Sequence, residues 1–463
     1  MLVAALVIAA VAGCGGGTEA RSGSPTGRTP VVVDTDMSTD DILALLYLAQ
    51  RDDVDIRAVT VSGTGVARCP QGAANALALL AQAGRGDVPV ACGRADPLAG
   101  FNAFPAQWRD AADAFYGLRL PPARRTVEPG GAEVLLRSVL GDATATVTVL
   151  SLAPMTNTAA VLRADPAVRS RIGAIYAMAG AVGVPGNIGP GHEDVEYNVW
   201  VDPTAARIVL AAGVPVTLVP LDATNDVPIT PAFATALRRH HDATPAAATA
   251  WSLLRRNAFL FAGGQYFWDP LAATAVTQPG LLRFEDRRLA VATTAGAEYG
   301  RVVAARSARR VRVAVGARRA GFENHLLTTL LGGRRATIAR ERPTVTLSFD
   351  GRRCTYRGPR RLPPGRFTID TVDRGGAGYR LVAVRLYERR TIADLRAAVT
   401  DADGRLEPST WVSPSVVGDT PPNGRLTWLG RVDTGPSDTR IAVACVGAAG
   451  TTTLAPVLLA PPR

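Results

Sequence analysis

The segment VVVDTDMSTDDILALLYLA, residues Val31–Ala49, decides the fold and indicates where a site lies. Three consecutive valines predict a buried strand that ends at Asp34, and the apolar spacing from Asp40 onward predicts a helix to Gln50. Four carboxylates fall within eight positions where these two elements meet: Asp34, Asp36, Asp40 and Asp41. Carboxylates this close repel one another, so they need protons or a cation to coexist at neutral pH.

Strand-like and helix-like segments alternate from residue 31 onward. After the first pair come IRAVTVSG, QGAANALALLAQAG and VPVACG, and the alternation continues through ATVTVLSLAP, MTNTAAVLRADP, IGAIYAMAGA, DPTAARIVLAAG and VPVTLVPLDAT. This pattern, with strands rich in Val, Ile and Leu, predicts an α/β fold with an open, mostly parallel sheet covered on both faces. Ligands bind beyond the carboxyl ends of the strands in such sheets, and the aspartates lie at that end of the first strand.

The character of the sequence changes near residue 333. We predict an α/β domain over residues 30–332, a linker over 333–343 and a second domain over 344–463. The second domain contains short segments that are rich in β-forming residues and bounded by Gly, Pro and Asp: TVTLSFDG, CTYRGP, GRFTIDTVD, YRLVAVRLYE, GRLTWLGRVD and TRIAVACVG. These segments predict a small antiparallel β-sandwich.

The N-terminus, MLVAALVIAAVAGCGGG, indicates export. Its apolar run is shorter than the roughly 20 residues that span a bilayer, which is typical of a signal peptide, although no basic residue precedes it. The segment Val11–Cys14 resembles the lipobox of bacterial lipoproteins, which implies cleavage before Cys14, lipidation of Cys14 and anchoring on the outer side of the bacterial cytoplasmic membrane. We expect a signal over residues 1–14 and a flexible tether over 15–29. The alternative is an ordinary secretory signal with an incidental cysteine.

Cysteine usage agrees with an oxidising compartment. When Cys14 is set aside, four cysteines remain, in two well-separated pairs. We predict the disulfides Cys69–Cys92 and Cys354–Cys445, the second tying the first and last strands of the sandwich. The alternative is four buried free thiols.

The basic net charge of +11 is carried by arginine, and the chain contains no lysine. A basic charge can mark a nucleic-acid-binding surface, but these arginines are scattered in pairs, with no long run and no interleaved aromatic residues. We therefore expect no nucleic-acid partner. The lack of lysine also argues against a phosphatase with an aspartyl nucleophile, a class that the D-x-D motif would otherwise suggest.

The aspartate cluster favours a hard divalent cation. Carboxylate oxygens select Ca²⁺ or Mg²⁺, and Ca²⁺ takes about 6–8 oxygen ligands. The spacing is not that of an EF-hand loop, which needs D-x-D-x-D-G and a glutamate at its twelfth position. The alternative, that Asp40 and Asp41 only cap a helix N-terminus, accounts for one carboxylate more readily than for four.

Four ordered motifs resemble the inosine–uridine nucleoside hydrolase family over residues 30 to 332. DTDMSTDDILAL is similar to the family's D-x-D-x-G-x-D-D-x-x-A-L signature, with Ser38 in place of the glycine. LSLAPMTNTAAVL, MAGAVGVPGNIGPGHEDVEYNVWVDPTAA and YFWDPLAA then resemble the later motifs in the family's order. Four motifs in order are more specific than any one alone.

The resemblance implies calcium-dependent hydrolysis of the N-glycosidic bond of ribonucleosides to ribose and free base. It implies that Ca²⁺ is bound by Asp36, Asp41, Asp269 and the main-chain carbonyl of Leu152, and that Asp40 is the base that activates the attacking water. Asn187, Glu196 and Asn198 would bind the ribose, and Asp34 would support the loop. The transition state of such a reaction resembles an oxocarbenium ion, so an anionic floor would stabilise it.

Departures from the family pattern concern the leaving base. Trp268 stands where some members carry a His that protonates the base; members with Trp there stack the base instead, which slightly favours purines. Trp108 is a candidate second stacking face or an ordinary surface aromatic, and His192 a candidate general acid or a solvated loop residue. Many members also carry an Asn in the loop after the second strand, where this chain has Thr64. The changes at Thr64 and Trp268 keep a second hypothesis open: a calcium-containing surface protein that binds a nucleoside or sugar without turnover. Either protein could form a homo-oligomer.

Overall fold

The structure, a computed structural model, describes two domains. It covers residues 27–189, 191–261, 265–296, 298–339, 345–359, 365–386, 391, 393–395, 412–420, 424–432, 440–447 and 452–459. The predicted signal and Cys14 lie outside the described residues. Within them, no helix combines the length and the apolar character that crossing a bilayer requires.

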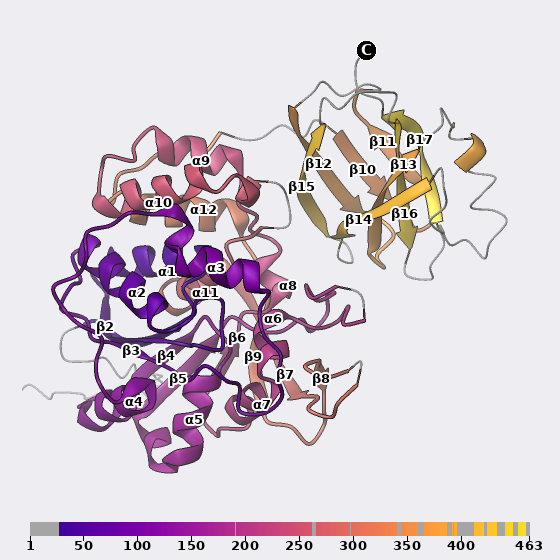
Figure 1. Ribbon diagram of the computed structural model, residues 1–463. Helices are drawn as coiled ribbons and strands as arrows, with labels where there is room; N and C mark the ends of the chain where they lie inside the picture. Colours follow the sequence, from indigo (N-terminus) through magenta and orange to yellow (C-terminus); the bar gives the residue numbers. More distant parts are fainter. Residues whose placement is uncertain are drawn as a thin grey trace, which may run out of the picture.

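A nine-stranded sheet forms the centre of the N-terminal domain (Figure 1). Its strands are β1 (Thr29–Thr35), β2 (Val54–Val61), β3 (Val90–Cys92), β4 (Val147–Ser151), β5 (Ile172–Ala177), β6 (Val216–Leu218), β7 (Leu282–Val291), β8 (Val302–Ala304) and β9 (Arg310–Ala317). They are ordered β3-β2-β1-β4-β5-β6-β9-β7-β8, and every neighbouring pair from β3 to β9 is parallel. Only β7 is reversed: it runs antiparallel to both of its neighbours, β9 and the edge strand β8. The prediction of an open, mostly parallel sheet is confirmed.

Helices cover both faces of this sheet (Figure 1). They are α1 (Thr39–Ala49), α2 (Gln71–Gln82), α3 (Ala106–Asp113), α4 (Gly131–Asp142), α5 (Thr156–Ala164), α6 (Tyr197–Val201), α7 (Pro203–Leu210), α8 (Leu221–Thr224), α9 (Pro231–Arg238), α10 (Pro245–Arg256), α11 (Trp268–Thr277) and α12 (Arg319–Leu330). One buried apolar cluster joins α1, α2 and α9–α12 to the sheet, and a second joins α4, α5 and α7 to its other face. Two apolar layers therefore hold the sheet between them.

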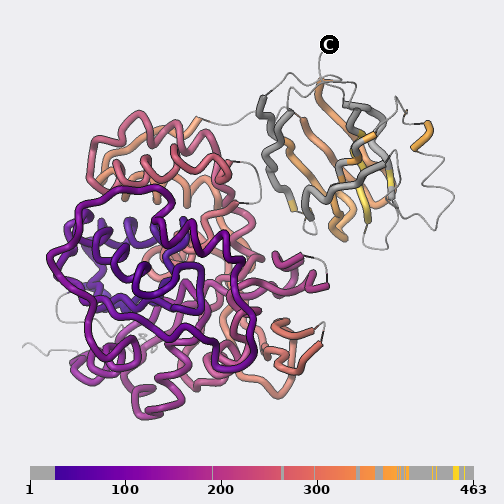
Figure 2. The backbone as a smooth tube through the Cα atoms, in the orientation of Figure 1, coloured from indigo at the N-terminus to yellow at the C-terminus, as the bar shows by residue number. Residues whose placement is uncertain are grey.

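The first helix is the centre of one of these layers. Every residue of α1 is buried, because α2, α10, α11 and α12 all pack against it. Figure 2 traces the chain through this domain, with the indigo N-terminal part lying beside segments that come much later in the sequence. The charged first turn of α1 is thus held inside the domain.

β1 lies at the point where the strand order of the sheet reverses, with β2 and β3 on one side and β4 to β6 on the other. β1 pairs with β2 on one side and with β4 on the other, and Asp34 lies opposite Ser151 of β4. A crevice forms at the carboxyl ends of the strands wherever the order reverses in this way. The segment after β1 and Leu152 after β4 both border that crevice.

The C-terminal domain is a sandwich of two four-stranded sheets. Its strands are β10 (Val345–Phe349), β11 (Cys354–Arg357), β12 (Gly365–Asp373), β13 (Tyr379–Leu386), β14 (Val412–Thr420), β15 (Arg425–Val432), β16 (Arg440–Gly447) and β17 (Thr452–Leu459). The sheets are ordered β11-β10-β12-β15 and β14-β13-β16-β17. The small β-sandwich is confirmed, but one pair, β10 with β12, is parallel. The strands β14 and β17 were not predicted because each contains a proline, which edge strands tolerate.

The disulfides differ in part from the prediction. Cys354 and Cys445 are bonded, and the bond joins β11 of one sheet to β16 of the other, so it does not tie the first and last strands. The predicted bond between Cys69 and Cys92 is wrong, because both are free thiols. Cys69 donates its thiol hydrogen to the Val61 carbonyl at 3.4 Å instead.

Candidate active site

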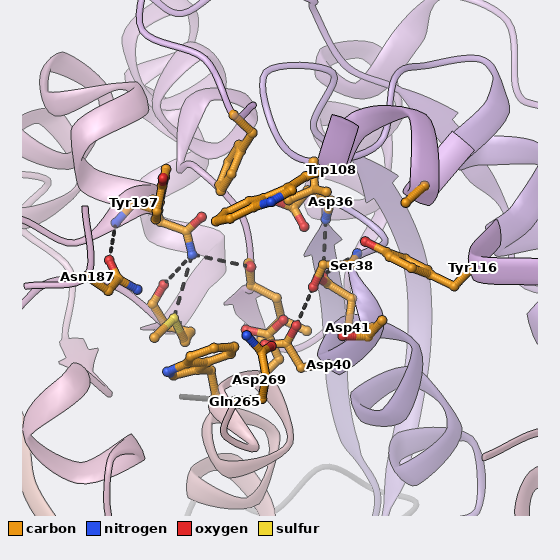
Figure 3. Close-up of a pocket in the computed structure, with 18 of the residues that line it drawn as sticks. Asp36, Ser38, Asp40, Asp41, Trp108, Tyr116, Asn187, Tyr197, Gln265 and Asp269 are labelled. Carbon is orange, nitrogen blue, oxygen red and sulfur yellow. Dashed lines mark hydrogen bonds between the residues drawn. The ribbon is translucent and has the colours of Figure 1, made fainter. Parts of the chain in front are cut away.

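A cavity of about 570 Å³ opens at the carboxyl end of the sheet (Figure 3). The structure brings together in its wall every residue predicted to bind metal, act as base or bind substrate: Asp36, Asp40, Asp41, Leu152, Asp269, Asn187, Glu196, Asn198, Trp268 and Trp108. These residues come from segments far apart in the chain, and they meet because β1, β4, α6 and α11 all end or begin at this edge.

Asp41 organises the turn between β1 and α1. Its Oδ1 accepts hydrogen bonds from Thr35 Oγ1 at 2.5 Å and from the Asp36 backbone N–H at 3.1 Å. Its Oδ2 accepts from the Ser38 backbone N–H at 3.0 Å. The helix-capping interpretation therefore describes part of what Asp41 does. It leaves the other carboxylates of the cluster without a capping role.

Three carboxylates share one small volume. Asp40, Asp41 and Asp269 offer oxygen atoms that all lie within 4.8 Å of one another, the only such group of acidic, His or Cys side chains in the part of the chain that the structure describes. Asp36 stands next to this group, and its backbone N–H donates to Asp41 Oδ1. We predicted Asp36 as a calcium ligand and Asp40 as the base. In the structure, the triplet contains Asp40 and not Asp36. The difference arises because an oxygen of Asp40 lies within 4.8 Å of oxygens of both Asp41 and Asp269.

The electrostatics of this group require a counter-charge. Burial, followed by the charge of Asp41, raises the pKa of Asp40 to about 7. Burial and neighbouring aspartates raise the pKa of Asp36 and of Asp269 well above the ordinary range. Buried carboxylates in contact are stable only with protons or a cation between them.

The donor set fits a hard divalent cation. The side chains are carboxylates, Asp269 Oδ1 is buried without a hydrogen-bond partner, and the backbone at Gly65 leaves room for Asp36 that a Cβ would fill. Oxygen donors of this kind suit Ca²⁺ or Mg²⁺. The carbonyl of Leu152, which accepts from Asn198 Nδ2 at 3.5 Å, faces the same cavity.

The opposite wall consists of amide and carboxylate groups at the start of α6. Glu196 accepts from the backbone N–H groups of Gly180 at 2.9 Å, Asn198 at 2.9 Å and Val199 at 3.2 Å. Asn187 Oδ1 accepts from the Tyr197 N–H at 3.0 Å. Burial raises the pKa of Glu196, although the three N–H groups oppose that rise. These contacts fix the orientation of the side chains before any ligand enters.

Aromatic rings form the mouth of the cavity. Trp108 is 42 % exposed, and its ring lies 5.2 Å from that of Tyr197, which stacks on Phe104 at 5.1 Å. Trp108 is therefore part of an aromatic cluster. The alternative hypothesis of an ordinary surface aromatic did not predict this cluster. Trp268 lines the cavity too, and its Nε1 is buried without a hydrogen-bond partner.

Three further residues named in the sequence analysis lie beneath or beside the cavity and do not line it. Asp34 is fully buried beneath the floor, where it accepts from Thr60 Oγ1 at 2.7 Å and Asn157 Nδ2 at 2.8 Å, and burial raises its pKa to about 7. The Thr64 hydroxyl is occupied by other hydroxyl groups of the protein. His192 does not line the cavity, so the structure does not support it as a general acid.

Sequence reasoning missed several lining residues: Phe104, Gln107, Tyr116, Tyr197, Phe259 and Gln265. Tyr197 could have been found, because it lies between Glu196 and Asn198 in a motif already singled out. The segment around Tyr116 carries no recognisable pattern, and its approach to the cavity depends on backbone geometry.

With this geometry established, comparison with known proteins identifies the family. The model of the inosine-uridine preferring nucleoside hydrolase family matches residues 31–324. The chain belongs to this family. The match covers the domain that holds the cavity and ends before the β-sandwich.

Individual members of the nucleoside hydrolase family are similar over shorter stretches. The pyrimidine-specific ribonucleoside hydrolase RihA of Photobacterium profundum is 34% identical over 196 residues, which is 42% of this chain and 61% of the relative. A probable uridine nucleosidase of Oryza sativa subsp. japonica is 32% identical over 201 residues, 43% of this chain and 60% of the relative. The chain thus spans about three fifths of the length of the curated relatives it matches.

Solved structures of nucleoside hydrolases share the fold. The purine-preferring ribonucleoside hydrolase from Gardnerella vaginalis superimposes with a TM-score of 0.58 at 25% identity, covering 66% of this chain and 99% of that structure. One of these relatives is named for pyrimidine specificity and another for purine preference. The choice of base therefore has to be inferred from this chain's own residues.

Proposed function

We propose that this protein hydrolyses the N-glycosidic bond of ribonucleosides to ribose and free base, using a Ca²⁺ ion held by the buried carboxylates. The observation that carries the proposal is the position of Asp40, Asp41 and Asp269, with Asp36 beside them, facing the wall of Asn187, Glu196 and Asn198 across one cavity. An acidic, cation-binding floor and a polar wall are what a sugar with a developing positive charge requires.

The carboxylates and the Leu152 carbonyl would hold the cation. When bound, Ca²⁺ supplies positions for vicinal sugar hydroxyls and lowers the pKa of water. Asp40 takes the proton of the attacking water on a carboxylate oxygen, and the Ser38 hydroxyl, which donates to Asp40 Oδ1, orients that carboxylate. Asp41, fixed by three donors, keeps the turn in place.

The remaining residues bind and orient the substrate. Glu196 and Asn187 are held rigidly by backbone N–H groups, so the sugar meets a wall whose geometry is already set. Trp108 and Trp268 offer two indole faces to the base, and we propose a preference for purines because a larger ring covers more of both. Stacking of this kind favours protonation of the leaving purine by solvent.

A substrate panel tests the function. Soluble protein that begins after residue 14 is given inosine, adenosine, guanosine, uridine and cytidine, with Ca²⁺ and with a chelator, and base release is measured. We expect release that depends on Ca²⁺ and is faster for purines. No release from any nucleoside, together with calorimetric binding of the same nucleosides, would support the non-catalytic binding protein instead.

We also propose that the protein is an exported lipoprotein. The lipobox-like Val11–Cys14 supports this, and the Cys354–Cys445 bond is typical of oxidising compartments. Labelling cells with a radioactive fatty acid should mark the full-length protein but not its Cys14→Ser variant. Equal labelling of both would contradict lipidation at Cys14.

A further inference from the structure

Tyr116 is a cavity residue whose backbone is strained. Phe115 has a φ of +53° and Tyr116 a φ of +50°, so two consecutive non-glycine residues occupy the left-handed region. Each such residue costs about 1–2 kcal/mol. A conformation of this kind persists only when its surroundings hold it in place, and it is found preferentially at functional sites.

The surroundings of Tyr116 do hold it. The Phe115 side chain is buried in the core, and its carbonyl accepts from the Leu118 N–H at 2.9 Å. Asn257 Nδ2 donates to the Tyr116 carbonyl at 3.1 Å while also bonding the Leu253 carbonyl at 2.8 Å, which ties the turn to α10. The result of these contacts is that the phenol ring of Tyr116 is presented to the cavity.

The Tyr116 hydroxyl lies on the side of the cavity that holds the carboxylates. Figure 3 shows its ring reaching toward Asp36 and Ser38, on the far side of the carboxylates from Asn187. A tyrosine hydroxyl is protonated at neutral pH, so it can donate a hydrogen bond to a ligand. No hydrogen bond joins this hydroxyl to another described residue.

Neighbouring hydroxyls are already engaged. Thr35 Oγ1 donates to Asp41, Ser38 Oγ donates to Asp40, and Thr64 is bonded to Ser62 and Thr156. The Tyr116 hydroxyl thus differs from these three in being open to the cavity. A bound ligand would therefore complete its hydrogen bonding.

We propose that the Tyr116 hydroxyl recognises the ribose 2′-hydroxyl and selects ribonucleosides over 2′-deoxyribonucleosides; this rests on the proposed function. In the pose that this proposal requires, the sugar diol would face the carboxylates and the 5′ side would face Asn187, which lies across the carboxylates from Tyr116 (Figure 3). The diol oxygen farther from the 5′ side is the 2′-hydroxyl, and Tyr116 lies at that end of the cavity.

The variant Tyr116→Phe tests this, because it removes the hydroxyl and keeps the ring. We measure kcat/KM for inosine, 2′-deoxyinosine and 3′-deoxyinosine. Loss of one hydrogen bond should lower the values for inosine and 3′-deoxyinosine about 10-fold and leave that for 2′-deoxyinosine unchanged. Tyr299→Phe, remote from the cavity wall, is the matched control and should change none of the three.

Binding gives a readout that does not need turnover. Calorimetry in the Asp40→Asn background should show tighter binding of inosine than of 2′-deoxyinosine, and Tyr116→Phe should remove about 10-fold of that difference while Ca²⁺ affinity stays the same. Equal losses for both nucleosides, or no loss, would overturn the inference. A wild-type protein that binds nucleosides with this discrimination but releases no base would refute the proposed hydrolysis and leave the role of Tyr116 intact.

Discussion

Gly65 and Asp36 face each other so closely that a Cβ on Gly65 would stand 2.1 Å from the Asp36 Cβ. The loop after β2 therefore fixes the position of a proposed cation ligand. Gly65→Ala should push Asp36 aside and weaken Ca²⁺ binding at least 10-fold in calorimetry. Gly141→Ala, with open space around its Cβ in α4, should keep normal Ca²⁺ affinity and stabilise the fold slightly. Normal Ca²⁺ affinity in Gly65→Ala would show that Asp36 does not bind the ion.

The roles of Asp40 and Asp269 can be separated by experiment. Asp40→Asn should lower kcat by about 10²–10⁴-fold, because the base is lost, and should retain Ca²⁺. Asp269→Ala should lose Ca²⁺ itself, since a buried ligand is removed. Calorimetric titration with Ca²⁺, together with rates of base release, distinguishes the two. If Asp40→Asn also fails to bind Ca²⁺, Asp40 is a ligand, as its place in the carboxylate triplet allows.

The thermal stability of the calcium-free protein should depend on pH. Burial raises the pKa of Asp34 and of Asp40 to about 7, so between pH 4 and 7 the folded state holds protons that the unfolded state releases. The free energy of unfolding contributed by these groups therefore falls as pH rises through this range.

Ca²⁺ should replace those protons and remove the penalty. The gain in Tm on adding Ca²⁺ should be larger at pH 7.5 than at pH 5, as measured by differential scanning calorimetry against a chelator. Mg²⁺ at the same concentration serves as a comparison for ion selectivity. A gain in Tm that is the same at both pH values would contradict the assigned protonation of the cluster.

The two tryptophans should determine the choice of base. Trp268→Ala and Trp108→Ala should each lower kcat/KM for inosine by about 10-fold or more, since base stacking contributes about 1–3 kcal/mol. The loss for uridine should be smaller, because its ring covers less of each indole. Trp251→Phe, on α10 and outside the cavity wall, is the control. Equal losses for inosine and uridine would refute the purine preference.

Removing the disulfide should lower the stability of the C-terminal sandwich and leave the N-terminal domain unchanged. The double variant Cys354→Ser/Cys445→Ser opens a loop of 91 residues and should lower the stability of the sandwich by about 2–5 kcal/mol. Hydrolysis should be unaffected, because the cavity residues all belong to the N-terminal domain. Hydrogen exchange at the backbone amides of β12, β13 and β16 can report on the sandwich. A parallel loss of activity would show that the two domains depend on each other.

Local patterns in the sequence predicted much of the fold and of the site. Alternating segments indicated the parallel sheet, and the motif resemblance brought Asp36 and Asp269 to one place although they are far apart in the chain. Properties set by tertiary contacts were not predictable. The free thiols of Cys69 and Cys92 and the approach of Asp40 to Asp269 both depend on how segments far apart in the chain pack together. Tyr116 was not predicted as a site residue, because its position depends on a left-handed backbone conformation that sequence propensities do not favour for tyrosine.

Trp268 and Asp269 are consecutive residues at the start of α11. A mutation that slides or rotates this helix would displace the indole and the carboxylate together. Changing the proposed base preference by altering α11 would therefore disturb the proposed ion site at the same time. Trp108 belongs to α3, so substitutions there could change the proposed base preference without moving Asp269.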